Sequence, residues 1–385
     1  MRVLVVAVPA PGHTNPLIPL VEALIRQGDD VVVASGADPG PAMTGLGARY
    51  QPAGHTEQEW FRALVGRTRG NPGDGLAPGR INHYFAPRLF GEIAAPDMVD
   101  DVISIGRQLQ PDVVLGETYA FASPVAAAFL GVPFAHHLIG PMLPEDVIEL
   151  VNDAVTPLWR SLGLDSPRHA GLYSGVTIRI TPPSLEARST PAGEGVFMRP
   201  APMPLRRPKP SAPPTVYLTM GTFFGGNTRV FRAVLDGLAG EAVQVVATVG
   251  SSQDPAALEP VPANTRVERF IPQADLLPDC SVVVHHGGAG TMYGSLAHGL
   301  PQVVIPQGAD NFINGELVRQ AGLGTSIGPD ELSAERVRQE VMGLLADREA
   351  AHAGRRLADE IAAMPSAADV AAQLRDRFGR GAARR

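Results

Sequence analysis

The segment VVVHHGGAGT, residues 282–291, places two histidines and a glycine-rich turn directly after a run of valines. Glycine lets the backbone approach a ligand closely, and the first N–H groups of a helix have no partner inside the helix. The positive end of the helix dipole lies at the same place, so such a turn suits an anion. We therefore predict a phosphate site where a buried strand passes into a helix over 291–298, with His286 and Thr291 as side-chain donors. The backbone donors are Gly287, Gly288, Ala289 and Gly290. The alternative is a tight strand-to-helix turn without a ligand.

Two known phosphate motifs do not fit this turn. A P-loop requires Lys followed by Ser or Thr after its glycines, and none is present here. A dinucleotide fingerprint requires G-x-G-x-x-G, which GGAG is not, although Asp310 does lie about 20 residues on. The phosphate is therefore expected to belong to some other nucleotide ligand, and the missing fingerprint argues against a nicotinamide dehydrogenase.

A second candidate is His13, in APGHTNP, residues 10–16. It directly follows the first predicted strand, where parallel sheets place their ligands. An imidazole changes protonation near neutral pH, which suits a general base. The alternative is that His13 only caps the helix that follows.

Composition limits the class of protein. The chain has 385 residues, of which 44% are hydrophobic and 18% charged, and its mean hydropathy is +0.04. These values indicate a soluble globular protein of two domains. The start, MRVLVVAVPAPGH, is interpreted as a first strand and not a signal peptide, and no apolar run is long enough for a membrane span. The single Cys280 fits a reducing cytoplasm, and a net charge of −7 argues against nucleic acid as a partner.

Strands and helices alternate along both halves. Apolar runs without alternation, spaced by helical stretches such as 17–27 and 123–130, predict parallel strands buried on both faces. The expected strands are 3–8, 31–34, 111–116, 132–137, 215–220, 243–249, 265–271, 281–286 and 301–306. The segment 66–92 is rich in Gly and Pro and is expected to be irregular.

Proline marks the domain boundary. Residues 198–214 contain seven prolines, which favour an extended interdomain linker. A last helix is expected after Pro365, followed by a frayed basic tail. The expected parts are an N-terminal domain 1–200, a linker 201–214, a C-terminal domain 215–364 and a C-terminal helix and tail 365–385.

Several segments together resemble the family 1 glycosyltransferases. The segment HHGGAGT is preceded by FIPQADLLPDC (270–280) and followed by GLPQVVIPQGADN (299–311), which are similar to the donor-binding region of that family. PGHTNPLIPL (11–20) and IAAMPSAADVAAQL (361–374) are similar to its two ends. The closest likeness is to actinomycete enzymes that glycosylate antibiotics and other natural products. This resemblance implies a GT-B fold, with two facing Rossmann-like domains of parallel sheets, the acceptor in the first and the nucleotide sugar in the second.

The resemblance also implies roles for donor-binding residues. Thr222 of TMGT and Gly12 join His286 and the glycine turn at the diphosphate. Phe270 and Ile271 match the base-binding segment, although a Phe at a strand end is usually core. Asp310 and Asn311 match a pair that contacts donor-sugar hydroxyls. The family usually has Gln at the second position, and Asn311 also suits a turn.

On the acceptor side, a basic histidine needs an orienting carboxylate on its other nitrogen. The family has Asp at the position of Glu117, so the longer Glu117 either completes the pair with His13 or is a surface charge. Tyr84 and Phe85 are candidates for an apolar acceptor pocket, or else pack in the core. No metal pair of carboxylates is evident and the family implies none, so no metal or cofactor is expected and dipoles and histidine replace the cation.

The residue after the glycine turn bears on the nucleotide. Family members that use ribose nucleotides commonly have a Glu there, whereas this chain has Gly294. A small residue fits a 2′-deoxyribose, which favours a dTDP-sugar over a UDP-sugar. The expected protein is an inverting glycosyltransferase that moves a deoxysugar to a hydrophobic, polyketide-like aglycone, with His13 as general base. Its expected partners are the aglycone and the nucleotide sugar, and it is expected to be a cytoplasmic monomer or homodimer.

Two other functions share this architecture. A nucleotide-sugar 2-epimerase would act on a UDP-sugar without an acceptor, but the His13 segment suits a second substrate. A non-catalytic relative that binds or activates a partner enzyme would not need His13, which is present.

Overall fold

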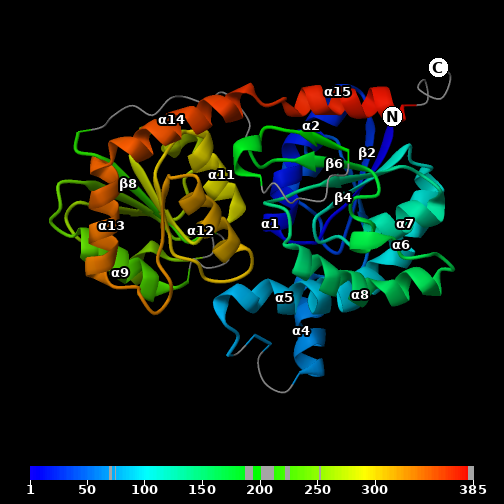
Figure 1. The fold of residues 1–385 in the computed structure, drawn as a ribbon, viewed down its shortest axis with the longest axis horizontal. Coiled ribbons are helices and arrows are strands. Elements are labelled where there is room, and N and C mark those ends of the chain that lie inside the picture. Colours follow the sequence, from blue (N-terminus) through cyan, green and yellow to red (C-terminus); the bar gives the residue numbers. More distant parts are fainter. Residues whose placement is uncertain are drawn as a thin grey trace. The chain divides into compact units, whose positions relative to one another are not determined.

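The computed structural model describes residues 1–68, 72–73, 75–186, 194–200, 212–221, 226–250 and 253–379. The chain forms two compact units (Figure 1). One comprises Met1–Arg199 together with Pro365–Arg385, and the other comprises Pro200–Met364. Most of the proline-rich segment expected as a linker, residues 201–211, lies outside the described residues, as does the basic tail from residue 380.

The described part of the first unit is built on a parallel seven-stranded sheet of order β3-β2-β1-β4-β5-β6-β7. The inner strand β1 (Arg2–Val6), next to the central β4, reads RVLVV, and its last four residues are buried because helices cover both faces. Parallel strands end at one edge of a sheet, so the segments after β1 and β4 lie near each other. The remaining strands are β2 (Asp30–Ser35), β3 (Arg49–Pro52), β4 (Val113–Glu117), β5 (Phe134–His137), β6 (Val176–Arg179) and β7 (Gly195–Phe197).

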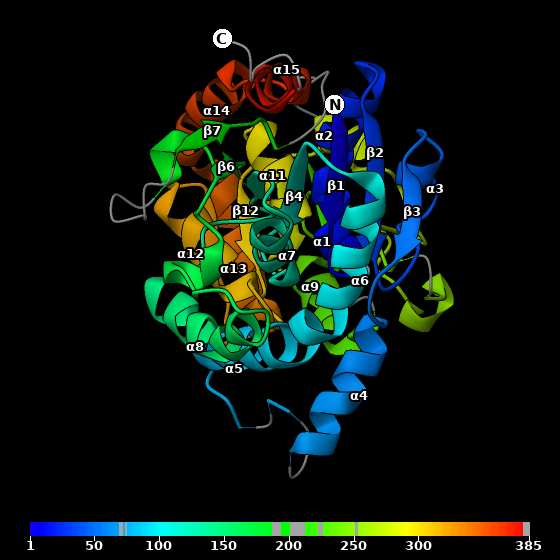
Figure 2. The same ribbon diagram turned by 90° about the vertical axis from the view of Figure 1, so that its right-hand side faces the viewer.

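Helices α6 (Ala95–Leu109) and α7 (Ala122–Leu130) lie side by side over one face of this sheet (Figure 2). The C-terminal helix α15 (Ala367–Phe378) packs against α2 (Ile18–Arg26). Asp29 explains this attachment, because its buried carboxylate accepts from both the N-terminal amine and Arg375 of α15. The other α-helices in the described part of the unit are α1 (Pro11–Thr14), α3 (Pro41–Thr44), α4 (Glu57–Arg67), α5 (Ile81–Phe85) and α8 (Glu145–Ser161).

The prediction of an irregular segment over 66–92 is wrong for its second half. Helix α5 is followed without a break by a π-helix, Ala86–Ala94. Its apolar side chains Leu89, Phe90 and Ile93 are buried in the core of the unit. Gly91 allows the close approach to α8, since a Cβ there would lie 3.0 Å from Cβ of Ala154. Tertiary packing therefore overrides the local effect of Gly and Pro.

The second unit has a parallel six-stranded sheet of order β10-β9-β8-β11-β12-β13 in its described part. Its centre consists of β8 (Thr215–Thr219) and β11 (Val282–His285), whose valines and leucine are fully buried. The other strands are β9 (Gln244–Thr248), β10 (Thr265–Glu268), β12 (Gln302–Val304) and β13 (Gly324–Ser326). The helices are α9 (Thr228–Leu238), α10 (Gln273–Leu276), α11 (Ala289–Ala297), α12 (Asn311–Gln320), α13 (Ala334–Ala346) and α14 (Arg348–Ala363).

Among the helices that the structure describes, none combines the length and the apolar character needed to cross a membrane.

Candidate active site

The end of β1 brings His13 to Glu117. His13 is the third residue of α1, and the following helix α2 has Leu17 as its N-cap with no side-chain cap, so the imidazole does not cap that helix. Instead its Nδ1 lies 3.1 Å from Oε1 of Glu117. With a carboxylate at Nδ1, the imidazole keeps its proton on that nitrogen, and Nε2 is the atom that can take a second one. The arrangement is that of a base and its orienting group.

Glu117 is a buried residue and not a surface charge. It ends β4, and its side chain has 0% exposure. Besides His13, its carboxylate accepts from the backbone N–H of Val8 at 3.3 Å and of Tyr119 at 2.9 Å. These donors satisfy a charge that would be costly to bury alone. The longer side chain thus reaches His13 from the strand end.

Two aromatic rings that we did not predict surround His13. Its ring centroid lies 5.6 Å from that of Phe90 and 5.3 Å from that of Tyr119, and these two rings are 4.9 Å apart. Phe90 comes from the π-helix, a geometry that is often found at functional sites. Only 14% of the His13 side chain is exposed, so the His13–Glu117 interaction is weakly screened by water.

Tyr84 and Phe85, the predicted acceptor residues, are half-buried in α5 and pack against the core of the first unit. Phe85 stacks with Phe61 of α4, with ring centroids 6.2 Å apart, and Arg88 lies over the Tyr84 ring at 4.5 Å. The geometry supports packing for both residues, and their contact with an acceptor stays a prediction. Gly12 of α1 is open, since a Cβ there would meet nothing within 4 Å.

In the second unit, Gly287 turns the chain from β11 into α11. Its φ is +96°, which favours glycine, and a Cβ would lie 2.8 Å from the carbonyl oxygen of Asn311. Gly288 is the N-cap, so the unpaired N–H groups at the start of α11 follow immediately. The predicted donors Ala289, Gly290 and Thr291 form the first turn of this nine-residue helix. The hydroxyl of Thr291 also accepts from Gln273 at 2.8 Å.

The ring of His286 lies between two glycines. A Cβ at Gly221 would be 2.5 Å from its Cε1, and a Cβ at Gly288 would be 2.4 Å from its Nε2. Burial lowers the pKa of His286 to about 4, so it is neutral at pH 7 and can donate a hydrogen bond but not a charge. Thr222, the predicted partner on the other side of Gly221, lies outside the described residues.

The neighbouring His285 has a structural role, because both of its ring nitrogens form hydrogen bonds within the protein. Its Nδ1 accepts from the N–H of Gly287 at 3.1 Å, so its Nε2 donates to Oε1 of Gln302 at 2.8 Å. Burial, and secondarily the nearby His286, lower its pKa to about 3. A neutral His285 therefore supports the turn from inside, a role that two adjacent histidines in the sequence do not reveal.

Asp310 and Asn311 start α12, close to the glycine turn. Asn311 is 2% exposed, and its Oδ1 accepts from the N–H groups of Gln307 and Gly308 at 3.3 and 3.2 Å. It therefore closes the turn after β12, as in the alternative interpretation. Asp310 is half-buried and accepts from Nδ2 of Asn314 at 2.9 Å. Asn314 was not predicted.

Phe270 and Ile271 follow β10 at the same edge of the sheet as the glycine turn. The Phe270 side chain is 63% exposed, which excludes a core role, whereas Ile271 packs partly buried beside Leu276 and Leu277. Gly294 lies in α11, where a Cβ would come 3.2 Å from Cδ1 of Leu277. Packing against Leu277 is thus a second reason for a small residue at position 294.

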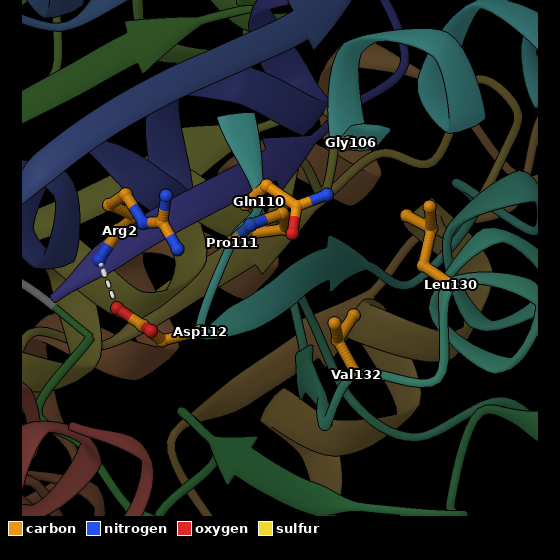
Figure 3. Close-up of a pocket in the computed structure, with 7 residues that line it drawn as sticks. All are labelled: Arg2, Gly106, Gln110, Pro111, Asp112, Leu130 and Val132. Atoms are coloured by element: carbon orange, nitrogen blue, oxygen red, sulfur yellow. Dashed lines mark hydrogen bonds between the residues drawn. The ribbon is translucent and has the colours of Figure 1, made fainter. Parts of the chain in front are cut away.

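A recess in the first unit lies away from these residues. A hollow of about 190 Å³ opens at the start of β1 and β4, the edge opposite to His13 (Figure 3). There the N–H of Arg2 donates to Asp112 at 2.7 Å. None of the predicted site residues lines it. Within the described ranges no three His, Cys, Asp or Glu side chains are grouped so as to hold a metal ion.

Known proteins are similar to this chain in sequence and in fold. The family described as "Erythromycin biosynthesis protein CIII-like" matches with its N-terminal domain over residues 83–200 and with its C-terminal domain over 232–376. The elloramycin glycosyltransferase ElmGT of Streptomyces olivaceus is 32% identical over 98% of both chains. The 10-deoxymethynolide desosaminyltransferase of Streptomyces venezuelae is also 32% identical, over 97% of this chain and 96% of its own. The chain belongs to the actinomycete natural-product glycosyltransferases.

Solved structures agree with this assignment. The Streptomyces sp. SF2575 glycosyltransferase SsfS6, complexed with thymidine diphosphate, superposes with a TM-score of 0.77 at 27% identity, over 98% of this chain and 99% of its own. The spinosyn rhamnosyltransferase SpnG, at 24% identity, has a TM-score of 0.80 over 97% of this chain and all of its own. The predicted GT-B fold is confirmed. The protein is a glycosyltransferase, which sets aside the epimerase and the non-catalytic alternatives.

Proposed function

We propose that this glycosyltransferase moves a deoxysugar from a dTDP-sugar to a hydroxyl of a hydrophobic, polyketide-like aglycone, with inversion at the anomeric carbon. The observation that carries the proposal is the contact between His13 and the buried Glu117 at the end of the first sheet. A histidine oriented in this way can take a proton from an acceptor hydroxyl.

The chemistry is a single displacement. Nε2 of His13 takes the hydroxyl proton as the acceptor oxygen attacks the anomeric carbon. The bond from that carbon to the diphosphate breaks, and dTDP leaves with the electron pair. Glu117 stays ionised and stabilises the imidazolium that forms. Attack opposite to the leaving group inverts the configuration, and the proton is later released to water.

The second unit supplies the charge stabilisation. The N–H groups that begin α11 and the neutral His286 are suited to the diphosphate, whose negative charge grows as the bond breaks. The exposed ring of Phe270 offers a face on which a nucleotide base can stack. The role of Asp310 at the sugar hydroxyls rests on its place beside the glycine turn.

The nucleotide is proposed from Gly294 and from relatives. No carboxylate side chain is available at position 294 to hold a ribose 2′-hydroxyl. SsfS6 was solved with thymidine diphosphate, and the relatives include a desosaminyltransferase and a TDP-daunosamine transferase. These names support a dTDP-activated deoxysugar here.

A thermal-shift comparison of dTDP, UDP and NAD tests the nucleotide, because a ligand that binds only the folded state raises the melting temperature. We expect the largest shift with dTDP, and an equal or larger shift with UDP would contradict the proposed nucleotide. NMR of the glycoside formed from a dTDP-sugar of known anomeric configuration tests the stereochemistry. A product with retained configuration would refute the single displacement.

A further inference from the structure

The amide of Asn314 joins the glycine turn to Asp310. Asn314 lies in α12, one helical turn after Asp310, and is fully buried. Its Nδ2 donates to the carbonyl oxygen of Gly287 at 2.7 Å and to Oδ2 of Asp310 at 2.9 Å. An amide NH2 has two hydrogens, so each partner receives one. One side chain thus holds both a backbone group of the turn and a carboxylate.

The bond to Gly287 also sets the direction of the next N–H. A peptide unit is planar and trans, so the C=O of Gly287 and the N–H of Gly288 point in opposite directions. Because the oxygen is turned toward the buried Asn314, the N–H of Gly288 is turned away from it, at the N-cap of α11. Glycine has wide backbone freedom, and the turn would otherwise sample other orientations.

The other side of Gly287 is held as well. Its N–H donates to His285, which in turn donates to Gln302. The peptide groups before and after Gly287 are therefore both fixed by buried side chains. The side chain of Asn314 also donates to the carboxylate of Asp310.

We infer that Asn314 is a positioning residue that couples the nucleotide diphosphate to the donor sugar. It orients the Gly288 N–H toward the diphosphate and the Asp310 carboxylate toward the sugar hydroxyls. The inference rests on the proposed function, which assigns those two ligand groups. Loss of Asn314 should weaken the binding of both groups, whereas loss of Asp310 should weaken only that of the sugar.

Calorimetric titration with dTDP and with dTDP-glucose tests this coupling. In Asn314→Ala we expect the affinity for dTDP to fall on the order of tenfold, since a buried backbone acceptor loses its donor and the turn is released. The affinity for dTDP-glucose should fall further. Asp310→Ala should keep the affinity for dTDP and lose only the additional affinity that the sugar provides. The double variant should then bind dTDP-glucose no worse than Asn314→Ala, because the two changes remove one coupled interaction.

Asn264→Ala is the matched control. The amide of Asn264 also donates to backbone carbonyls, of Leu238 at 2.9 Å and Val243 at 3.1 Å, but before β10 at the opposite edge of the same sheet. It should lose stability without losing affinity for dTDP. Equal dTDP affinities of Asn314→Ala and Asn264→Ala would overturn the inference and leave the proposed function standing. Absence of dTDP binding by the wild-type protein would instead refute the proposed donor site and the inference with it.

Asn314→Asp keeps the volume of the side chain if the alanine variant does not fold. An aspartate between the Gly287 oxygen and Asp310 has no donor when ionised, but has one when protonated. The dTDP affinity of this variant, divided by that of the wild type, should therefore rise as the pH is lowered from 8 to 6. If this ratio of affinities does not depend on pH, the side chain at position 314 does not act as a hydrogen-bond donor to the turn.

Discussion

Nδ1 of His13 lies 3.1 Å from a Glu117 carboxylate that is completely shielded from solvent. The two residues are 104 positions apart in the chain and meet because β1 and β4 are adjacent parallel strands ending at one edge. The same carboxylate accepts two backbone N–H groups, so its position is set by the ends of the strands and not by His13 alone.

The orienting role of Glu117 predicts the effect of Glu117→Gln. Glutamine can still accept a hydrogen bond from His13 but cannot stabilise the imidazolium that forms during proton transfer. Turnover should fall by roughly 10–10³-fold, less than in a variant without His13, while the dissociation constant for dTDP stays the same. Steady-state kinetics together with dTDP titration checks this. Unchanged turnover would show that the contact is structural only.

The ring of Phe90 shields His13 from water, and Phe90→Leu should weaken that shielding while keeping the core filled. A loss of about 0.5–1.5 kcal/mol for an aromatic pair corresponds to a decrease in turnover of roughly 2–10-fold. Phe129→Leu is the control, since Phe129 is half-buried in α7 and its ring lies under Arg107 at 5.4 Å. Equal kinetic effects of the two substitutions would argue against a role of Phe90 at the site.

Donor binding should depend on His286. We expect His286→Ala to weaken dTDP by about 1–3 kcal/mol, the range for a lost hydrogen bond to a charged group. Gly288→Ala should act in the same direction, because its Cβ would lie 2.4 Å from Nε2 of His286. Gly343→Ala, in the exposed part of α13 where a Cβ meets nothing within 4 Å, should leave dTDP affinity unchanged. Calorimetry that finds the same affinity in all three variants would remove His286 from the donor site.

Buried histidines predict a stability that decreases in acid. Burial lowers the pKa of His136 and His285 to about 3 and of His137 and His286 to about 4, against ~6.5 in an unfolded chain. Below pH ~6.5 the unfolded chain therefore binds more protons than the folded one, so the free energy of unfolding falls as the pH is lowered toward about 4. Each histidine contributes up to about 1.4 kcal/mol per pH unit in this window. Above pH ~6.5 its contribution is complete and constant.

Urea unfolding between pH 7 and pH 4.5 measures this slope. His136→Leu should make the slope smaller, because the variant lacks one of the four groups and the ring of His136 has no hydrogen-bond partner among the described residues. A slope identical to that of the wild type would show that His136 does not titrate as its burial requires.

The central strands of both sheets could be predicted from sequence because they are buried on both faces and read as unbroken apolar runs. The strands β3, β6, β7 and β13 could not. Strands β3 and β13, at the outer edges, read RYQP and GTS and have no buried residue. An edge strand is covered on fewer sides, so it needs no apolar run. The π-helix was missed for a related reason, since its Gly and Pro are compensated by packing on α8.

The candidate site, too, could be predicted from the sequence only in part. The glycine turn and His13 are local patterns, in which a few adjacent residues define the chemistry. Asn314 contacts Gly287, and Phe90 contacts His13, because separate elements pack together. Nothing in the sequence next to Asn314 or Phe90 identifies either as a site residue. Asn311 was predicted to contact the sugar, but its Oδ1 accepts from two backbone N–H groups of the turn. The sequence allowed both roles, and only the folded turn distinguishes between them.

The most direct test of the account is His13→Ala, measured for turnover and for dTDP affinity on the same preparation. If His13 is the general base for an alcohol or phenol acceptor, turnover should fall by roughly 10²–10⁴-fold, the usual contribution of general-base catalysis. The dissociation constant for dTDP should remain that of the wild type, because the residues proposed to hold dTDP belong, apart from Gly12, to the second unit, and the alanine variant leaves Gly12 in place. A variant that keeps wild-type turnover with such an acceptor would contradict the assignment of His13 as the base.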